Sequence, residues 1–499
     1  MWAGGCEVCK GSPSKPLPWP GTNLKDLNRY LVAERCFDKI DILEQRDQVG
    51  GVWNYSFARE KDRLPSEIPQ ENVSPPLEEP IWRAGKTHGV DGNVSQSATF
   101  VSPLYDGLET NIPRSLMQFS DLPFPKGTQL FPEFEKVLAY LEDYSEDVKH
   151  LIQFHVQVLD VRLDDETAGT WAVTRKDLKT GKVRTDIYDA VVAASGHYNV
   201  PYVPSIEGIS VWHQTYPGSI RHSKFYTSAD AYKNKKVVVV GNSASGIDIG
   251  KQISRVCRGP LLLSTRSESY FTTGTDSGNR EYSPIAEFLS PESHNRAVRF
   301  ENGEIEEDID SIVFCTGYLY SFPFLETLQP PVITDGSRTL HAYQHLFYTS
   351  QPTLVFPVLT QKVIPFPTSE VQSSVFARVW SGRLSLPSKE EMDAWEEQTQ
   401  VSRGSGKSFH VMAFPMDADY INYMHDWAAR AEPCPGLEND GHGKEGPYWG
   451  EKERWTRQRF TQIKQAFAGQ GEARHHIQRM EDLGFDFEAW KRAQADIQT

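Results

Sequence analysis

Cysteine is scarce in this chain, with six residues among 499. Six cysteines in a chain of this length do not make the dense disulfide framework of a small secreted domain. Cys6 and Cys9 form a single C-x-x-C pair, whereas a structural zinc site would need a second pair at suitable spacing. The sequence therefore predicts neither a disulfide scaffold nor a metal site.

Long hydrophobic runs are also missing. No stretch of about 18 apolar residues occurs, which is the length that a transmembrane helix requires. The first residues lack the basic and then apolar order of a secretory signal. Basic residues number 52 against 67 acidic ones, so the net charge is −15, which argues against a nucleic-acid partner. We expect a soluble, cytoplasmic protein.

The most informative segment that the chain does contain is VVVVGNSASGID at residues 237–248. Four valines predict a buried parallel strand, and a turn of the form G-x-S-x-S-G and an amphipathic helix follow it. The glycines let the backbone approach a pyrophosphate, and the helix start offers free N–H groups and the positive end of the helix dipole. We therefore expect a dinucleotide phosphate site at Gly241, Ser243, Ser245, Gly246, Ile247 and Asp248.

The residue that would read the ribose supports this interpretation. About 20 residues after the last glycine, such motifs carry the side chain that binds the adenine ribose. This offset reaches Arg266, and an arginine suits the additional 2′-phosphate of NADP, where an acid would favour NAD. A glycine turn in an ordinary βα unit remains the alternative, but it would not require the arginine.

A second nucleotide site is only half present. Residues 40–43 predict a strand that ends at Glu44, where an acid typically binds a ribose hydroxyl. Counting back about 20 residues reaches Leu24 and not a glycine motif. Either the first residues replace the usual ones, as a mis-joined exon would, or the chain has lost affinity for this nucleotide. The intact pattern from Phe37 onward favours the first explanation.

Two strands with similar endings enclose the glycine-motif unit. Residues 188–194 run into Ser195-Gly196-His197, and residues 309–314 run into Cys315-Thr316-Gly317-Tyr318. We therefore predict an α/β protein with two nested Rossmann-like dinucleotide-binding domains. The expected division is a first part of the FAD domain (1–205, with 1–35 anomalous), an inserted NADPH domain (206–312), a second part of the FAD domain (313–386) and a helical tail (387–499).

These residues resemble the flavin-containing monooxygenases, particularly the soluble fungal, dimethylaniline monooxygenase-like type, from about Phe37 to Leu386. The most specific match is YPGSIRHSKFY at residues 216–226, which follows the family signature F-x-G-x-x-x-H and a later aromatic residue. Tyr216 replaces the first phenylalanine. Baeyer–Villiger enzymes end this signature with Trp-Pro, which Tyr226-Thr227 does not match. Further matches are Glu44-Gln45-Arg46, Gly50-Gly51-Val52-Trp53, residues 105–111 and the two strand endings.

The resemblance implies FAD and NADPH as cofactors. NADPH would reduce FAD, and the reduced flavin would take up O2 to give a C4a-hydroperoxide that oxygenates an amine, thiol or thioether. It also implies the site residues. Asn111 would act at the junction of flavin and NADP, Thr110 would touch NADP, and Gly51, Val52 and Trp53 would line FAD. His222 would be a supporting residue and not a proton donor.

Three other functions remain open. A flavoprotein reductase of the disulfide type would need a redox-active cysteine pair, and Cys6 and Cys9 are the only close pair. A catalytically impaired relative that cannot hold FAD is supported by the missing first glycine motif. Baeyer–Villiger oxygenation of ketones is the third. The sequence does not name the substrate, and a homo-oligomer is possible.

Overall fold

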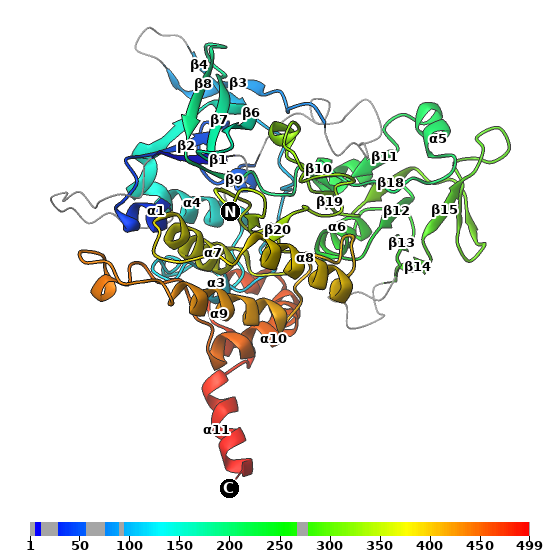
Figure 1. The fold of residues 1–499 in the computed structure, drawn as a ribbon. Coiled ribbons are helices and arrows are strands. Elements are labelled where there is room, and N and C mark those ends of the chain that lie inside the picture. Colours follow the sequence, from blue (N-terminus) through cyan, green and yellow to red (C-terminus); the bar gives the residue numbers. More distant parts are fainter. Residues whose placement is uncertain (1–4, 11–27, 56–74, 89–93, 267–277, 499) are drawn as a thin grey trace.

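A mixed sheet and a parallel sheet, each with helices against it, form the α/β frame of the protein (Figure 1). The computed structural model describes residues 5–10, 28–55, 75–88, 94–266 and 278–498. The predicted fold class is confirmed, because the glycine-motif sheet lies in sequence between strands of the first sheet.

The first sheet has seven strands in the order β20-β21-β22-β9-β1-β2-β5. Its β9 consists of five buried residues, AVVAA, and pairs in parallel with β22, as β2 does with β5. Such continuous apolar runs are typical of strands that are covered on both faces. The strands are β1 (Gly5–Lys10), β2 (Lys39–Glu44), β5 (Ile152–Phe154), β9 (Ala190–Ala194), β20 (Ala342–Tyr343), β21 (Phe347–Tyr348) and β22 (Leu354–Val355).

Strand β1 lies in residues 1–35, which the sequence set apart as anomalous and for which no strand was assigned. It lies between β2 and β9 and runs antiparallel to both. Gly5 pairs with Glu44, and Lys10 pairs with Lys39. The carboxyl end of β1 therefore lies at the opposite end of β2 from Glu44. Local composition did not reveal this pairing, because strand direction is decided by neighbouring strands.

The second sheet is fully parallel, with the order β11-β18-β12-β13-β14. Its central β12 is the four-valine strand, and all four residues are buried. The expected boundary between 312 and 313 falls inside β18, whose residues all pair with β12. The strands are β11 (Ile220–His222), β12 (Val237–Val240), β13 (Leu262–Ser264), β14 (Arg280–Tyr282) and β18 (Ser311–Phe314), and helix α6 (Ala244–Ser254) follows β12.

Two short linker strands connect the sheets. The chain leaves the first sheet through β10 (Val200–Pro201) and returns through β19 (Tyr318–Leu319). These strands pair antiparallel, with Val200 opposite Leu319. The exit and the return therefore lie side by side, as a nested insertion requires.

Smaller elements surround the two sheets. An antiparallel pair of β3 (Ile81–His88) and β4 (Val94–Thr99) lies before the chain enters the helical segment around α3 (Arg114–Met117), while residues 56–74 and 89–93 lie outside the described ranges. The others are β6 (Val156–Asp165), β7 (Thr170–Asp177), β8 (Val183–Tyr188), β15 (Ile285–Phe288), β16 (Val298–Phe300), β17 (Ile305–Glu306), α4 (Phe134–Ser145) and α5 (Ile209–Thr215).

The carboxyl-terminal part is helical. It contains α7 (Pro365–Trp380), α8 (Lys389–Arg403), α9 (Met416–Ala428), α10 (Glu451–Gly469) and α11 (Phe487–Gln498). Helix α7 is almost entirely buried and packs against α9, whereas α11 extends away from the body (Figure 1). Among the helices of the described residues, none combines the length and the apolar character that a bilayer crossing requires.

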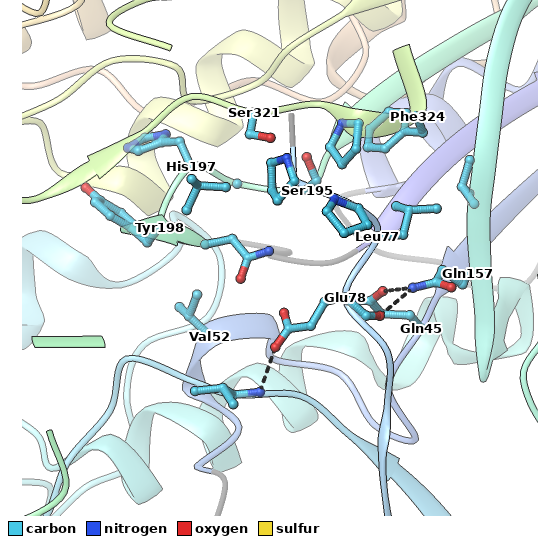
Figure 2. A pocket seen from close by; sticks show the side chains of 18 of the residues that line it. Gln45, Val52, Leu77, Glu78, Gln157, Ser195, His197, Tyr198, Ser321 and Phe324 are labelled. Atoms are coloured by element: carbon cyan, nitrogen blue, oxygen red, sulfur yellow. Dashed lines mark hydrogen bonds between the residues drawn. The ribbon is translucent and has the colours of Figure 1, made fainter. Parts of the chain in front are cut away.

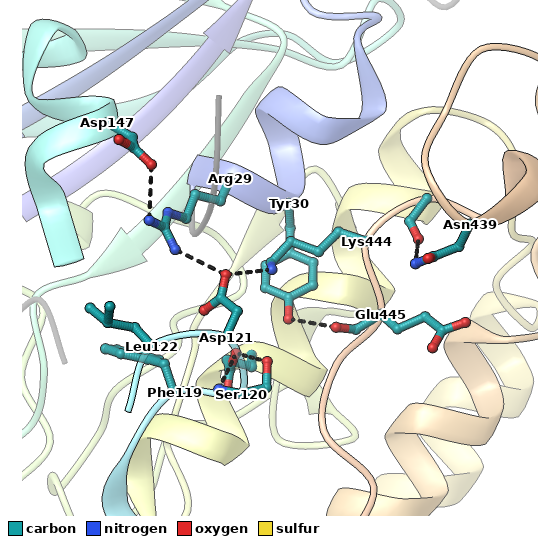
Figure 3. Close-up of polar contacts among 12 residues, drawn as sticks. Arg29, Tyr30, Phe119, Ser120, Asp121, Leu122, Asp147, Asn439, Lys444 and Glu445 are labelled. Atoms are coloured by element: carbon teal, nitrogen blue, oxygen red, sulfur yellow. Dashed lines mark hydrogen bonds and ion pairs between the residues drawn. The ribbon is translucent and has the colours of Figure 1, made fainter. Parts of the chain in front are cut away.

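Helix α1 (Asn28–Glu34) was not expected either, and it is firmly attached to distant parts of the chain. Arg29 forms ion pairs with Asp121 and Asp147, each at 3.1 Å, and Lys444 reaches the same Asp121 at 3.1 Å (Figure 3). The Tyr30 hydroxyl donates to the Glu445 carbonyl at 3.2 Å. Because these partners lie far away in the sequence, α1 is part of the folded core.

Candidate dinucleotide-binding sites

The turn between β12 and α6 is built so closely that only glycine fits. Gly241 has φ 101°, and a Cβ there would lie 2.7 Å from the Cys315 carbonyl oxygen. A Cβ on Gly246 would lie 2.0 Å from the Gly241 carbonyl oxygen. The turn therefore brings the start of α6 directly over the carboxyl end of β12, where backbone N–H groups can approach a phosphate.

The first residues of α6 leave that helix start open. Ser243 is the N-cap residue, and its side chain makes no capping hydrogen bond to the helix. Ser245 and Ile247 lie half-buried in the first turn of α6. The predicted phosphate-binding residues thus come together at one point, and the free N–H groups remain available for an anion.

Asp248 has a structural partner in addition to its predicted place beside the phosphate. The Tyr105 hydroxyl donates a hydrogen bond of 2.7 Å to its carboxylate. Burial raises the pKa of Asp248, and this hydrogen bond opposes the rise. The contact attaches α6 to the segment that continues to Thr110 and Asn111.

Arg266 lies at the same edge of the second sheet. It follows β13 by two residues, and Ser264 at the end of β13 pairs with Val240 at the end of β12. The Arg266 side chain is exposed, and it forms no ion pair with a carboxylate in the described ranges. This position agrees with a role in binding a phosphate near the glycine turn.

Glu44 ends β2 in a fully buried position. Its Oε1 accepts a hydrogen bond of 2.8 Å from the Arg46 backbone N–H, while its Oε2 has no partner among the described residues. Burial raises the pKa of Glu44 to about 7, against the opposing effect of the Arg46 charge. A buried carboxylate oxygen without a partner is costly, and a ribose hydroxyl would satisfy it.

A cavity of about 110 Å³ (Figure 2) begins at the two residues that follow Glu44 in the chain, Gln45 and Arg46. Gln45, Arg46 and Val52 line it from one side. Ser195, His197 and Ser321 line the other side, and one buried polar atom of each has no partner within the described part of the chain. Burial lowers the pKa of His197 to about 4, so its ring is neutral. The cavity therefore offers several unused hydrogen-bonding groups.

The sequence did not assign these further lining residues. Ser195 and His197 belong to a strand ending that the sequence analysis named without giving it a role. Ser321 follows β19, and no local sequence motif marks it as a binding residue. Gln157 also lines the cavity, where its amide donates to the Glu78 carbonyl at 2.9 Å and to Gln45 at 3.3 Å (Figure 2). These contacts bring segments together that are distant in sequence.

Of the predicted flavin-lining residues, Val52 reaches the cavity. Gly51, Val52 and Trp53 form a single 3₁₀ turn, with Gly50 before it at φ 102°. Trp53 packs instead against the aromatic cluster around Tyr140, and its buried Nε1 has no partner among the described residues. The turn thus places the Val52 side chain, but not that of Trp53, against the cavity.

Thr110 and Asn111 differ in their surroundings. Thr110 is buried, and its hydroxyl donates to the Ile112 carbonyl at 2.9 Å. Asn111 is exposed and does not belong to the lining of the described cavity. Its predicted catalytic role therefore stays a prediction.

His222 has the supporting position that the resemblance implies. Its Nδ1 accepts from the Lys224 backbone N–H at 3.1 Å, so Nε2 carries the proton that is donated to the Gly317 carbonyl at 2.9 Å. Burial lowers the pKa of His222 to about 3. The neutral ring joins β11 to the turn after β18.

The described residues fit NADPH but only part of FAD. The second sheet provides the tight turn, the open helix start and Arg266. At the first sheet, Glu44 provides the ribose acceptor, but β1 is antiparallel and cannot present a phosphate-binding turn beside it. The cavity of about 110 Å³ is also below the roughly 300–1,000 Å³ of typical ligand sites. The stretch near Leu24, where the turn was expected, lies outside the described residues.

Comparisons with known proteins agree with this arrangement. Residues 91–281 and 290–439 match the family described as flavin-binding monooxygenase-like. Flavin-containing monooxygenase FMO GS-OX-like 2 of Arabidopsis thaliana is 33% identical over 402 residues, which cover 77% of this chain and 78% of that protein. FMO GS-OX-like 4 of the same plant is 34% identical over 365 residues, or 70% of this chain and 73% of the relative.

Solved structures give the same result. S-allyl-L-cysteine S-oxygenase from Allium sativum superimposes with a TM-score of 0.67 at 26% identity, covering 88% of this chain and 90% of the other. Tmm from Pelagibacter sp. strain HTCC7211, with a TM-score of 0.61 at 18% identity and coverage of 85% and 83%, shares the fold. The chain therefore belongs to the flavin-binding monooxygenase family, whose members use FAD and NADPH.

Proposed function

We propose that this chain uses NADPH and FAD to insert one oxygen atom of O2 into a soft nucleophile, with the sulfur of a small thioether as the preferred target. The preference for sulfur over an amine nitrogen rests on the solved relative at 26% identity, which is an S-oxygenase of S-allyl-L-cysteine, a thioether. An amine remains the alternative substrate class.

The nested arrangement supports the redox part of the proposal. Tyr198, Asn199 and Val200 line the cavity at Gln45 and Arg46, and Val200 then begins the linker strand β10 that leads into the second sheet. A nucleotide at the cavity would therefore lie next to the entrance of the NADP unit. Electron transfer from one cofactor to another requires such proximity.

A second candidate function follows from strand β1. Because β1 runs antiparallel, the described residues provide no phosphate-binding turn at Glu44. The chain would then be a relative that binds NADP(H) but cannot retain FAD. Its second sheet and glycine turn would be unaffected.

The test starts with purified full-length chain, supplied with FAD and then with NADPH without oxygen. The proposal expects bound flavin whose visible absorbance is lost with NADPH and returns in air. A thioether should then give a sulfoxide that carries oxygen from labelled O2, with a higher kcat/KM than a tertiary amine of similar size. Protein that binds NADP+ but takes up no FAD would refute the monooxygenase proposal and support the second candidate.

A further inference from the structure

Lys407 lies in the loop between α8 and α9, far in sequence from the glycine motif at residues 241–246. Its Nζ is 3.2 Å from the centroid of the Tyr202 ring. Tyr202 is itself attached to the second sheet, because its backbone N–H donates to the Gly317 carbonyl at 2.9 Å and its carbonyl accepts from the Thr316 hydroxyl. The loop between α8 and α9 therefore places the Lys407 ammonium group near the carboxyl end of β18.

That position is beside the predicted phosphate site. Phe314 at the end of β18 pairs with Val240 at the end of β12, immediately before the glycine turn. Arg266 follows the neighbouring strand β13 at the same edge. Lys407 and Arg266 are close enough for the charge of Arg266 to act on Lys407, although they lie 141 residues apart in the sequence. We call them the Lys407–Arg266 pair.

The two positive charges of the Lys407–Arg266 pair favour a bound anion. Burial and the like charge of Arg266 lower the pKa of Lys407 to about 8, with only Asp335 acting in the opposite direction. Neither cation forms an ion pair with a carboxylate in the part of the chain that the structure describes. Two neighbouring cations that have no carboxylate in ion-pair contact repel one another, and a bound phosphate would offset this repulsion.

We propose that Lys407 binds the 2′-phosphate of NADP(H) together with Arg266 and so determines the preference for NADP over NAD. This inference rests on the proposed function insofar as the second sheet must hold NADP(H). The Tyr202 ring keeps the ammonium group at the site through a cation–π contact. Such a contact is weak enough to be exchanged for a charge-assisted hydrogen bond to phosphate.

The test compares the Kd values of NADP+ and NAD+ by titration calorimetry with full-length protein, which requires no turnover. Lys407→Met keeps an unbranched side chain against Tyr202 but removes the charge. The Kd of NADP+ should rise about tenfold, as expected for loss of one charge-assisted hydrogen bond of roughly 1.5 kcal/mol. The Kd of NAD+ should stay within about twofold, because NAD+ has the same pyrophosphate and lacks the 2′-phosphate.

Two further variants separate a specific role from a general charge effect. Lys407→Arg should restore most of the NADP+ affinity, and Lys136→Met, on the exposed face of α4, should leave both Kd values unchanged. Equal losses for NADP+ and NAD+, or no loss for NADP+, would overturn the inference while the proposed function stands. If the unmodified chain bound no NADP+, both the proposed function and this inference would be wrong.

Discussion

Gly246 provides the sharpest test of the phosphate-binding turn. In a Gly246→Ala variant, the new Cβ would lie 2.0 Å from the Gly241 carbonyl oxygen and 2.8 Å from its carbonyl carbon. Since ordinary contacts are 3.4 Å or longer, α6 must move away from β12 by more than about 1 Å. Overpacking of this kind costs about 1–3 kcal/mol, and better helix propensity returns up to about 1 kcal/mol.

Gly250, four residues further along α6, is the matched control. A Cβ there would meet only the Leu261 and Leu263 side chains, at 3.4 and 3.8 Å. Gly250→Ala should therefore keep or slightly raise the melting temperature. Gly246→Ala should lower it by about 1–2 °C, because 1 kcal/mol corresponds to roughly 1 °C in a chain of 499 residues.

Affinity for NADP+ should separate the two variants further. A displacement of about 1 Å misaligns the helix N–H groups with the pyrophosphate, so Gly246→Ala should raise the Kd of NADP+ at least about tenfold. Titration calorimetry and thermal denaturation of both variants give the answer. If Gly246→Ala bound NADP+ like the unmodified protein and melted together with Gly250→Ala, the close approach of α6 to β12 would not exist.

Two further predictions concern stability. Burial raises the pKa of Glu370 from 4.5 to about 7, so between these pH values the folded state keeps a proton that the unfolded state loses. The free energy of unfolding should therefore fall as pH rises from about 4.5 to about 7. Glu370→Gln should make this fall shallower in urea denaturation, and an unchanged pH dependence would contradict the assignment. Asp417 and Arg457 form a buried ion pair at 2.6 Å, so Asp417→Ala should cost about 3–5 kcal/mol by leaving a buried charge. Asp419→Ala, which removes the exposed pair with Arg454 on the same two helices, should cost less than about 1 kcal/mol in the same assay.

Much of the second sheet could be predicted because its signals are local. Four valines, a glycine turn and an amphipathic helix follow one another without interruption, so the strand, turn and helix start are determined by neighbouring residues. The structure has β12 at Val237–Val240 and α6 at Ala244–Ser254, where the pattern expects them. The nested order was also readable, because two similar strand endings enclose this unit.

The first site could be predicted only in part. Glu44 and the turn at Val52 were recognised from short motifs, and Val52 does line the cavity. Strand β1 and helix α1 were missed because both are short and lie on either side of the proline-rich residues 11–21, whose prolines break regular structure. Their positions depend on partners such as Glu44 for β1 and Asp121 for α1, which no local pattern reveals.

By itself, the sequence determined the α/β class, the NADP-binding unit and the family, since each depends on contiguous motifs or on fixed spacings along the chain. Only the tertiary structure decided the antiparallel direction of β1, the cavity between Gln45, Gln157 and Ser321, and the arrival of Lys407 beside Arg266. The physical reason is that these features arise from contacts between distant segments. Backbone pairing and burial of the whole chain select such contacts, and the periodicity of the sequence does not predict them.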